Sequence, residues 1–271
     1  MRKSQWLLAG CVFAGMLTLN TASAQEEIAS PFEDHFRLTA GLLSANSDTE
    51  LRLDADDGTP GTLVSAETDL GLRDQSEQAD VEVEMRIRER HRLRFNYFRL
   101  DRSAVQAIDR QILFGDETFD ASDLVESRLD WREFSITYGY TFLRTERFEL
   151  FGSFGVHLVE MSAQGEVAAD DIREEETEAA PIPALGLGTL VRFSDRFHFE
   201  ARVDYLTANV DEFDGTVLDV RAGLLYRFNR NLAVGVAYML MEREGNSADI
   251  GDSGHLSLRN SGPELFLRVA F

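Results

Sequence analysis

The chain has almost none of the residues that thiol chemistry or lysine-based charge pairing would need. Its single cysteine, Cys11, and its single lysine, Lys3, both lie near the N-terminus of the 271 residues. Downstream of them no side chain can form a disulfide or act as a catalytic thiol. Every remaining side chain of fixed positive charge is an arginine, whose planar guanidinium donates paired hydrogen bonds to a carboxylate. We therefore expect arginine-carboxylate pairs wherever charge is enclosed.

Long apolar runs are also missing after the first residues. Beyond residue 24, no segment approaches the roughly 18 apolar residues that a transmembrane helix requires. If the chain crosses a membrane, it must do so as a closed barrel, in which every backbone polar group is paired. There are only 5 prolines and no linker rich in Pro, Ser or Gly. We therefore expect one domain, residues 25–271.

The first residues have the pattern of an export signal. Met-Arg-Lys precedes an apolar run over residues 6–19, and small residues follow up to Ala24. This pattern predicts a signal peptide, residues 1–24, whose cleavage leaves Gln25 as the first mature residue. The sequence LAGC at residues 8–11 leaves a lipoprotein open as an alternative, although the apolar run continues well past its cysteine. An exported chain without thiols fits a bacterial envelope.

Acidic residues are in large excess over basic ones. The formal net charge is −21, and loss of Arg2 and Lys3 with the signal peptide would make it −23. We therefore expect no nucleic acid among the partners of this protein.

The final residues show the alternation of a β-strand. In residues 263–271, Leu265, Leu267, Val269 and Phe271 all fall on one side of an extended chain. In a soluble protein a shared core would cover this apolar side, yet the chain stops on its last apolar residue. We therefore expect a face that meets lipid.

The same alternation recurs along the chain. Short turns and long acidic segments alternate as the connections between the predicted strands. The predicted strands are 35–43, 81–87, 92–97, 133–142, 148–158, 185–193, 197–205, 218–228, 232–240 and 263–271. The predicted loops are 46–80, 164–180, 209–215 and 242–260, with short strand extensions allowed at 50–53 and 62–66. Segment 105–129 is predicted to be a long hairpin that projects beyond the membrane. A tilted strand needs about 9–11 residues to cross a bilayer, which most of these strands approach.

This pattern predicts an all-β fold, an antiparallel up-and-down transmembrane β-barrel of about 10 strands. Eight or twelve strands remain alternatives, because segments 51–64 and 105–129 can hold further hairpins. An even number of strands places both termini on the same side, and the short turns would face the periplasm. A soluble β-sandwich is the other reading, but its outer faces would be polar. Phenylalanines beside the short turns match an interfacial aromatic girdle: Phe142, Phe148, Phe193, Phe197, Phe228 and Phe271.

Several sequence blocks carry a resemblance to a known group of proteins. They are GTLVSAETDLGL, RLRFNYFRLDRSA, ITYGYTFLRTERFELFGSFGVHL, ALGLG and GPELFLRVAF. With them the chain resembles the small outer-membrane β-barrel proteins of Gram-negative bacteria, and within these a functionally uncharacterised family. Leu267, Val269 and Phe271 resemble the C-terminal signal that the outer-membrane assembly machinery recognises. The resemblance implies that machinery as a partner in biogenesis and an outer-membrane location beside lipid and lipopolysaccharide. Its motifs are specific for the barrel architecture and say little about activity.

Residues of the opposite parity would line the barrel interior, where carboxylates and arginines are equal in number. The predicted ion-pair lattice comprises Glu82, Glu84, Arg86, Arg92, Arg94, Glu133, Glu149, Arg192, Glu200, Arg202, Asp204, Asp219, Arg221, Arg227, Glu264 and Arg268, with His157 and His198 beside them. Burial of an unpaired charge costs several kcal/mol, so equal numbers favour a packed, paired interior. A porin-like channel with a charged constriction is the alternative.

No catalytic motif is present in the sequence. Ser153 and His157 lie on one side of a strand, but four residues along a strand span about 13 Å, too far for a hydrogen bond. Barrel proteases and lipid-modifying hydrolases carry His with Asp or Ser, which leaves a hydrolase as a further alternative. We expect no enzyme activity, no cofactor and a monomer. Runs at residues 54–57 and 170–176 could bind Ca²⁺ or Mg²⁺, although neither matches an EF-hand.

Overall fold

The computed structural model describes residues 30–167, 172–210, 213–247 and 253–271. The predicted signal peptide and the lipoprotein sequence lie outside these residues. The described chain is built from strands and loops, and it contains no helix long and apolar enough to cross a membrane.

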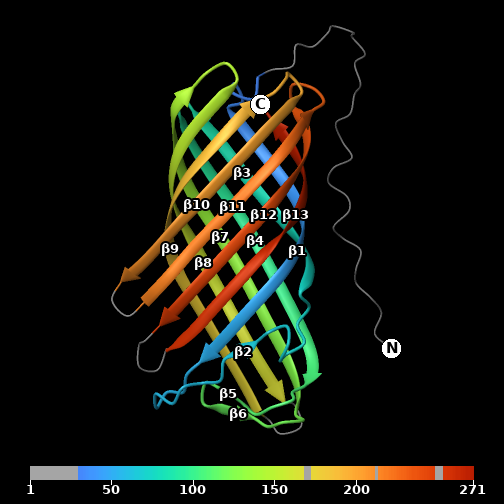
Figure 1. The fold of residues 1–271 in the computed structure, drawn as a ribbon, viewed down its shortest axis with the longest axis vertical. Coiled ribbons are helices and arrows are strands. Elements are labelled where there is room, and N and C mark those ends of the chain that lie inside the picture. Colours follow the sequence, from blue (N-terminus) through green and yellow to red (C-terminus); the bar gives the residue numbers. More distant parts are fainter. Residues whose placement is uncertain (1–29, 168–171, 211–212, 248–252) are drawn as a thin grey trace.

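Ten long strands form one closed antiparallel barrel in which each strand pairs with its neighbours along the chain (Figure 1). They are β1 (Phe36–Leu53), β3 (Gln75–Ile87), β4 (His91–Ala107), β7 (Leu124–Arg144), β8 (Phe148–Val167), β9 (Ile172–Arg192), β10 (Phe197–Val210), β11 (Phe213–Arg227), β12 (Leu232–Ser247) and β13 (Gly254–Ala270). The up-and-down barrel of ten strands is thus confirmed. We call the end with the short turns and Phe271 the turn end, and the opposite end the loop end.

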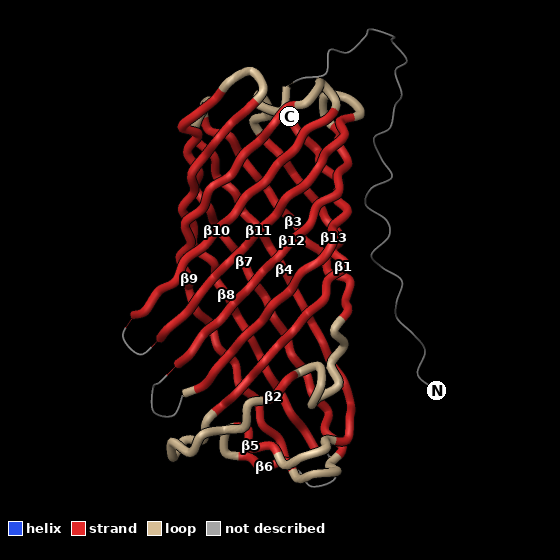
Figure 2. The backbone as a smooth tube through the Cα atoms, in the orientation of Figure 1, coloured by secondary structure: helices blue, strands red, loops and turns tan. Residues whose placement is uncertain are grey.

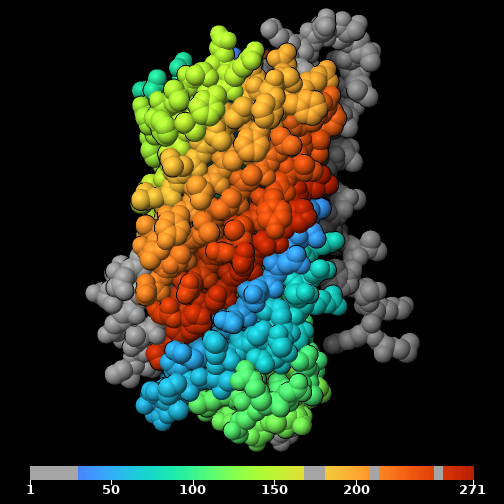
Figure 3. Space-filling model, viewed as in Figure 1, coloured from blue at the N-terminus to red at the C-terminus, as the bar shows by residue number. Residues whose placement is uncertain are grey.

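The terminal strand closes the barrel against the first. β13 pairs with β1 from Arg37↔Ala270 to Leu53↔Gly254, and the two lie side by side in the space-filling view (Figure 3). Beyond the strand, the Phe271 carbonyl accepts hydrogen bonds from the backbone N–H groups of His35 and Phe36, at 2.7 and 3.0 Å. No strand edge of the sheet is left unpaired along this seam.

The strands are longer than the sequence alternation indicated, and most of the predicted loops are wrong. Segment 164–180 is largely the paired ends of β8 and β9, and segment 242–260 is largely those of β12 and β13. Likewise, segment 209–215 lies almost wholly in β10 and β11. Acidic residues suggested loops there, but a strand outside a bilayer carries polar residues on its outer face as readily as a loop does. Figure 2 shows these strands running far toward the loop end.

The polarity of the strands reverses part of the way along the barrel. Near the turn end the outward residues are apolar and exposed, as in Ile136 and Phe134 on β7. The next outward residue toward the loop end is Arg132, whose guanidinium lies 2.9 Å from Glu160 on β8. Inside, Trp131 is 1% exposed. An apolar belt therefore surrounds only the half of the barrel nearer the turns, and the other half has a polar wall.

The predicted loop 46–80 and the predicted hairpin 105–129 fold over the loop end of the barrel, and 105–129 does contain a hairpin. In segment 46–80, a short β2 (Val64–Ser65) pairs with β1. In segment 105–129, β5 (Ile112–Phe114) and β6 (Glu117–Phe119) form a separate hairpin. Their apolar side chains join a buried cluster, Val64, Ile108, Ile112, Phe119, Val125 and Val167. These segments cover the mouth instead of extending away from it (Figure 1).

The aromatic residues predicted beside the short turns occupy the outer surface at the turn end. Phe142, Phe193, Phe197, Phe228 and Phe271 are at least half exposed. Phe148, at the start of β8, is partly buried. Exposed aromatic rings at one end of an apolar belt are typical of a membrane interface.

Candidate functional site

The structure places all of the predicted interior residues on the inner face of the barrel. The buried ones are Glu82, Glu84, Arg86, Arg92, Arg94, Glu133, Glu149, His157, His198, Asp204, Arg221, Arg227, Glu264 and Arg268. Arg192, Glu200, Arg202 and Asp219 are half-buried. Their parity was predictable because successive side chains of a strand point to opposite faces. Their partners were not, because most ion pairs join strands that are not neighbours.

Glu149 on β8 is the most enclosed carboxylate, with 0% of its residue surface exposed. Arg86 donates from its two terminal nitrogens at 2.9 and 3.0 Å, and Arg92 donates to Oε2. The Nε atom of Arg144 lies 3.3 Å from Oε1. Arg86 is on β3, which is separated from β8 by β4 and β7 in the barrel. These contacts therefore reach across the lumen near the turn end.

Two residues next to this cluster were not among the predicted ones. Arg37 donates from Nη1 to Glu84 at 3.1 Å and from Nε to Asp34 at 3.3 Å. Asp34 also accepts a hydrogen bond from Nη1 of Arg227, at 3.1 Å. Alternation with Leu38 could have identified Arg37 as an interior residue. Asp34 precedes the first strand, where no periodic signal exists.

The middle of the lumen is closed by pairs between β10, β11 and β13. Arg221 Nε donates to Glu264 at 2.8 Å, and Arg221 also donates to Glu200. Arg268 donates to both oxygens of Glu200, at 2.7 and 2.9 Å. The ring of Phe266 lies beneath two of these cations, 4.4 Å from the Arg221 guanidinium carbon and 5.4 Å from that of Arg268.

A further set of bonds ties β10 to the opposite wall. Arg94 on β4 donates to Asp204 at 3.0 Å, and Ser153 donates to the other oxygen of Asp204 at 3.0 Å. Arg202 donates to Glu82 on β3 at 2.5 Å. The spaces left among these side chains are small, about 30 Å³ and about 60 Å³. Within the described residues, the lumen at this level is filled by paired side chains.

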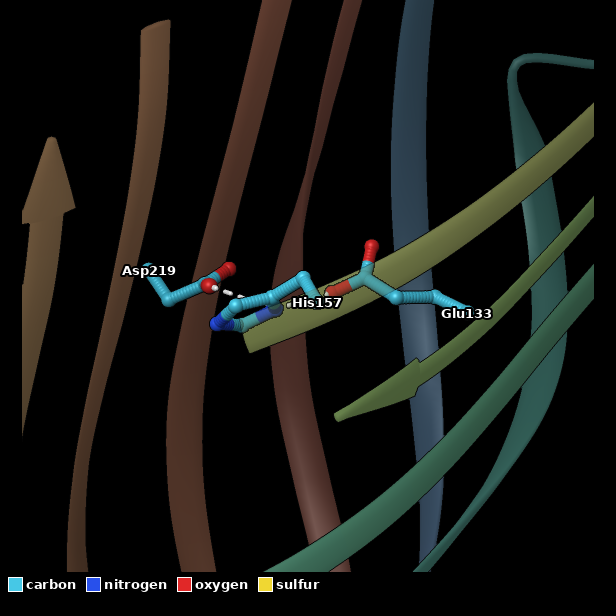
Figure 4. A group of neighbouring side chains, drawn as sticks. All are labelled: Glu133, His157 and Asp219. Carbon is cyan, nitrogen blue, oxygen red and sulfur yellow. Dashed lines mark hydrogen bonds and ion pairs between the residues drawn. The ribbon is translucent and has the colours of Figure 1, made fainter. Parts of the chain in front are cut away.

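Farther toward the loop end than these pairs lies a cluster of Glu133, His157 and Asp219 (Figure 4). His157 lies between the two carboxylates, with Nδ1 2.7 Å from Glu133 and 3.9 Å from Asp219. Arg243, which the sequence reading placed in a loop, donates to Glu133 at 2.7 Å and lies 3.0 Å from Asp219. A carboxylate-histidine set of this kind could hold a divalent cation. Here the Arg243 guanidinium already supplies the positive charge, so the arrangement fits an ion pair better than a metal centre.

Among the described side chains, no histidine is hydrogen-bonded to a serine. Ser153 bonds to Asp204, and His157 bonds to Glu133. Ser135 lies directly opposite His157 in the β7–β8 register, but no hydrogen bond joins these two described side chains. His255 contacts Asn246 at 2.7 Å near the loop end. No ion pair connects His198 or Arg192 to a described carboxylate.

The acidic segment 54–57 is fixed by its own hydrogen bonds. Asp54 accepts from the Gly61 N–H at 2.9 Å and from Ser253 Oγ at 2.8 Å. Slight burial acts to raise the pKa of Asp54, but these bonds and Arg52 outweigh it and lower the pKa below its usual value. The other acidic segment, 170–176, is only partly within the described residues, and its side chains are outside them.

The fold can be compared with solved structures. The outer membrane protease OmpT from Escherichia coli aligns with a TM-score of 0.50 at 10% identity, covering 92% of this chain and 100% of that one. The attachment invasion locus protein Ail of Yersinia pestis gives 0.37 at 9% identity, over 86% and 99%. A Pseudomonas aeruginosa FadL homologue gives 0.38 at 8% identity, over 88% and 90%. At such identities the likeness concerns the fold alone.

Sequence comparison adds a family without an assigned activity. Residues 132–250 match a family described as a protein of unknown function, DUF481. No curated protein matches the chain. The protein thus has the fold of the outer-membrane β-barrel proteins of Gram-negative bacteria, and from residue 132 to residue 250 it resembles an uncharacterised family.

Proposed function

We propose that this protein is an integral, non-enzymatic barrel of the Gram-negative outer membrane, with its lumen closed by the ion-pair lattice. Its role would be in envelope structure or in interactions at the cell surface. The observation that carries the proposal is the set of cross-lumen pairs at Glu149, Glu200 and Asp204, which leaves cavities of only about 60 Å³ or less at that level.

The outer surface supports the membrane location. An apolar belt with exposed phenylalanines at the turn end suits a bilayer, and the polar wall beyond it suits an aqueous exterior. The mature chain would begin at Gln25 and insert as a monomer through the assembly machinery, with Leu267, Val269 and Phe271 as its signal. The polar wall would stand among lipopolysaccharide head groups, where Ca²⁺ or Mg²⁺ could bridge acidic loops to phosphates.

Conductance in planar bilayers tests the closed lumen against a porin-like channel. The protein extracted from outer membranes should insert, as shown by protease protection, without producing stepwise currents in 1 M KCl. Paired substitution of Arg94 and Asp204 by alanine removes a cross-lumen contact and serves as the control, because it should produce measurable currents. Stepwise currents from the unsubstituted protein would contradict the proposal.

A hydrolase is the second candidate, favoured by one geometric observation. His157 is oriented by Glu133, and Ser135 lies opposite it across β7 and β8. Both are buried beneath the loop end, where a substrate would have to displace ion pairs. We therefore expect no labelling by a fluorophosphonate probe. Labelling that disappears in Ser135→Ala, but persists in Ser153→Ala, would establish the hydrolase instead.

A further inference from the structure

Beyond the ion-pair lattice, the loop end of the barrel encloses space of a different chemical kind. A cavity of about 100 Å³ lies in this half of the barrel. Its lining surface is mainly apolar and includes Trp131, Val159, Met161 and Ile182, with Arg52, Arg243, Glu244 and His255 as polar members.

Trp131 contributes a buried polar group to this cavity. The residue is 1% exposed, and its indole N–H has no hydrogen-bond partner within the described structure. A buried donor without a partner is rare in native proteins and unfavourable. A water molecule would need two to four polar partners in the same space, whereas most of the lining surface is apolar. An organic molecule with one acceptor atom would satisfy the donor and fill the apolar space together.

The charge of that molecule is restricted by the residues at the inner side of the cavity. Arg243 lines it, but its guanidinium is already bonded to Glu133 and Asp219. An anionic ligand would therefore meet two carboxylates that share one arginine. A neutral ligand avoids this repulsion.

The position of the cavity favours a dissolved molecule over a lipid. At the level of Trp131 and Arg243 the outer wall carries the pairs Arg132–Glu160 and Arg259–Glu242, at 2.9 and 3.2 Å. Charged pairs on the outer face place this level beyond the apolar belt.

We propose that the cavity beside Trp131 binds a small, neutral, mainly apolar solute whose oxygen accepts a hydrogen bond from the Trp131 indole N–H. The volume limits the size, because a cavity of about 150 Å³ accommodates benzene in another protein and this one, at about 100 Å³, is smaller. Acetone, a ketone of three carbons, is therefore a suitable probe. This binding site goes beyond the proposed function and does not depend on whether the lumen conducts.

The indole N–H signal of Trp131 provides a direct measurement. The chain has 2 tryptophans, Trp6 and Trp131, so protein from which the signal peptide is shown by mass spectrometry to be absent has a single indole. In lipid nanodiscs with ¹⁵N-labelled tryptophan, acetone should shift this signal saturably. Isobutene, which has a methylene group in place of the oxygen, should bind about tenfold more weakly because the donor stays unpaired. Equal affinity, or no saturable shift, would overturn the proposal.

Two further comparisons make the result specific. Ala163→Leu should abolish the shift by filling the cavity, whereas Ala201→Leu, on the outer face, should leave it unchanged; Val159→Phe is a second filling variant. Heat-modifiable migration shows which variants are folded. The signal should be the same in nanodiscs of ester-linked and ether-linked phospholipid. A dependence on the lipid linkage would identify a lipid carbonyl as the occupant and overturn the assignment to a solute.

Discussion

Trp131 and Glu133 are two residues apart on β7, and both side chains point into the barrel, yet their surroundings are opposite. Trp131 packs in an apolar cluster with Phe98, Leu100 and others. Glu133 accepts from Arg243 and contacts His157. On the outer face the order is reversed: Arg132, next to Trp131, is charged and paired with Glu160, whereas Phe134, next to Glu133, is apolar and exposed. The outer boundary of the apolar belt therefore crosses β7 between these residues.

Replacement of Glu149 by glutamine should strongly destabilise the barrel. The variant keeps the shape but leaves Arg86, Arg92 and Arg144 without their shared anion, and breaking a buried pair costs about 3–5 kcal/mol. The free energy of unfolding in urea, followed by Trp131 fluorescence in lipid vesicles, measures the loss. Glu160→Gln is the matched control, because Glu160 pairs with Arg132 on the exposed outer wall. Its substitution should lower the free energy of unfolding by about 1 kcal/mol or less. Similar losses in both variants would contradict the buried network.

A charge on the outer face should reveal where the bilayer lies on β7. Ile136→Arg places a guanidinium in the apolar belt and should reduce the free energy of unfolding in vesicles by about 2–4 kcal/mol. Asp130→Arg, six residues closer to the loop end on the same face, should change it by about 1 kcal/mol or less. If both substitutions are equally tolerated, the belt on this strand is not in contact with lipid.

Removal of Phe271 should reduce the amount of protein in the outer membrane. Deletion removes the proposed assembly signal together with the backbone bonds from His35 and Phe36 to the Phe271 carbonyl. Immunoblots of fractionated membranes compare this truncation with Phe228→Ala, an exposed phenylalanine at the same end. Refolding in detergent should remain possible for both. Normal membrane levels of the truncation would exclude the signal.

The loop that covers the mouth should loosen at low pH. Partial burial acts to raise the pKa of Asp69, but hydrogen bonds from Arg110 and from the Ser65 N–H outweigh it and lower the pKa below 3.8. Because the folded pKa is the lower one, this carboxylate stabilises the loop above pH 3.8, and the contribution is lost as pH falls through the folded value. Pepsin cleavage within residues 54–74 should therefore increase below that pH. In the Asp69→Asn variant the loop should already be loose at higher pH. Its cleavage should then vary with pH only as the activity of pepsin itself does.

The sequence predicted well which residues of each strand face outward, and it predicted poorly where each strand ends. Alternation around Phe134 and Ile136 was legible because lipid-facing residues are uniformly apolar. Alternation around Trp131 and Arg243 was overlooked, because beyond the bilayer the apolar side turns inward and the polar side resembles a loop. A search for period 2 with reversed polarity would have extended β7, β8 and β12.

The sequence by itself determined that this chain forms a membrane-type barrel and which side chains face its interior, because the direction of a side chain on a strand is a local property. Only the tertiary structure decided that Glu149 meets Arg86 and that Trp131 lines a cavity. Those contacts depend on how strongly the strands tilt and how the barrel closes between β1 and β13, and alternation along one strand carries no information about either.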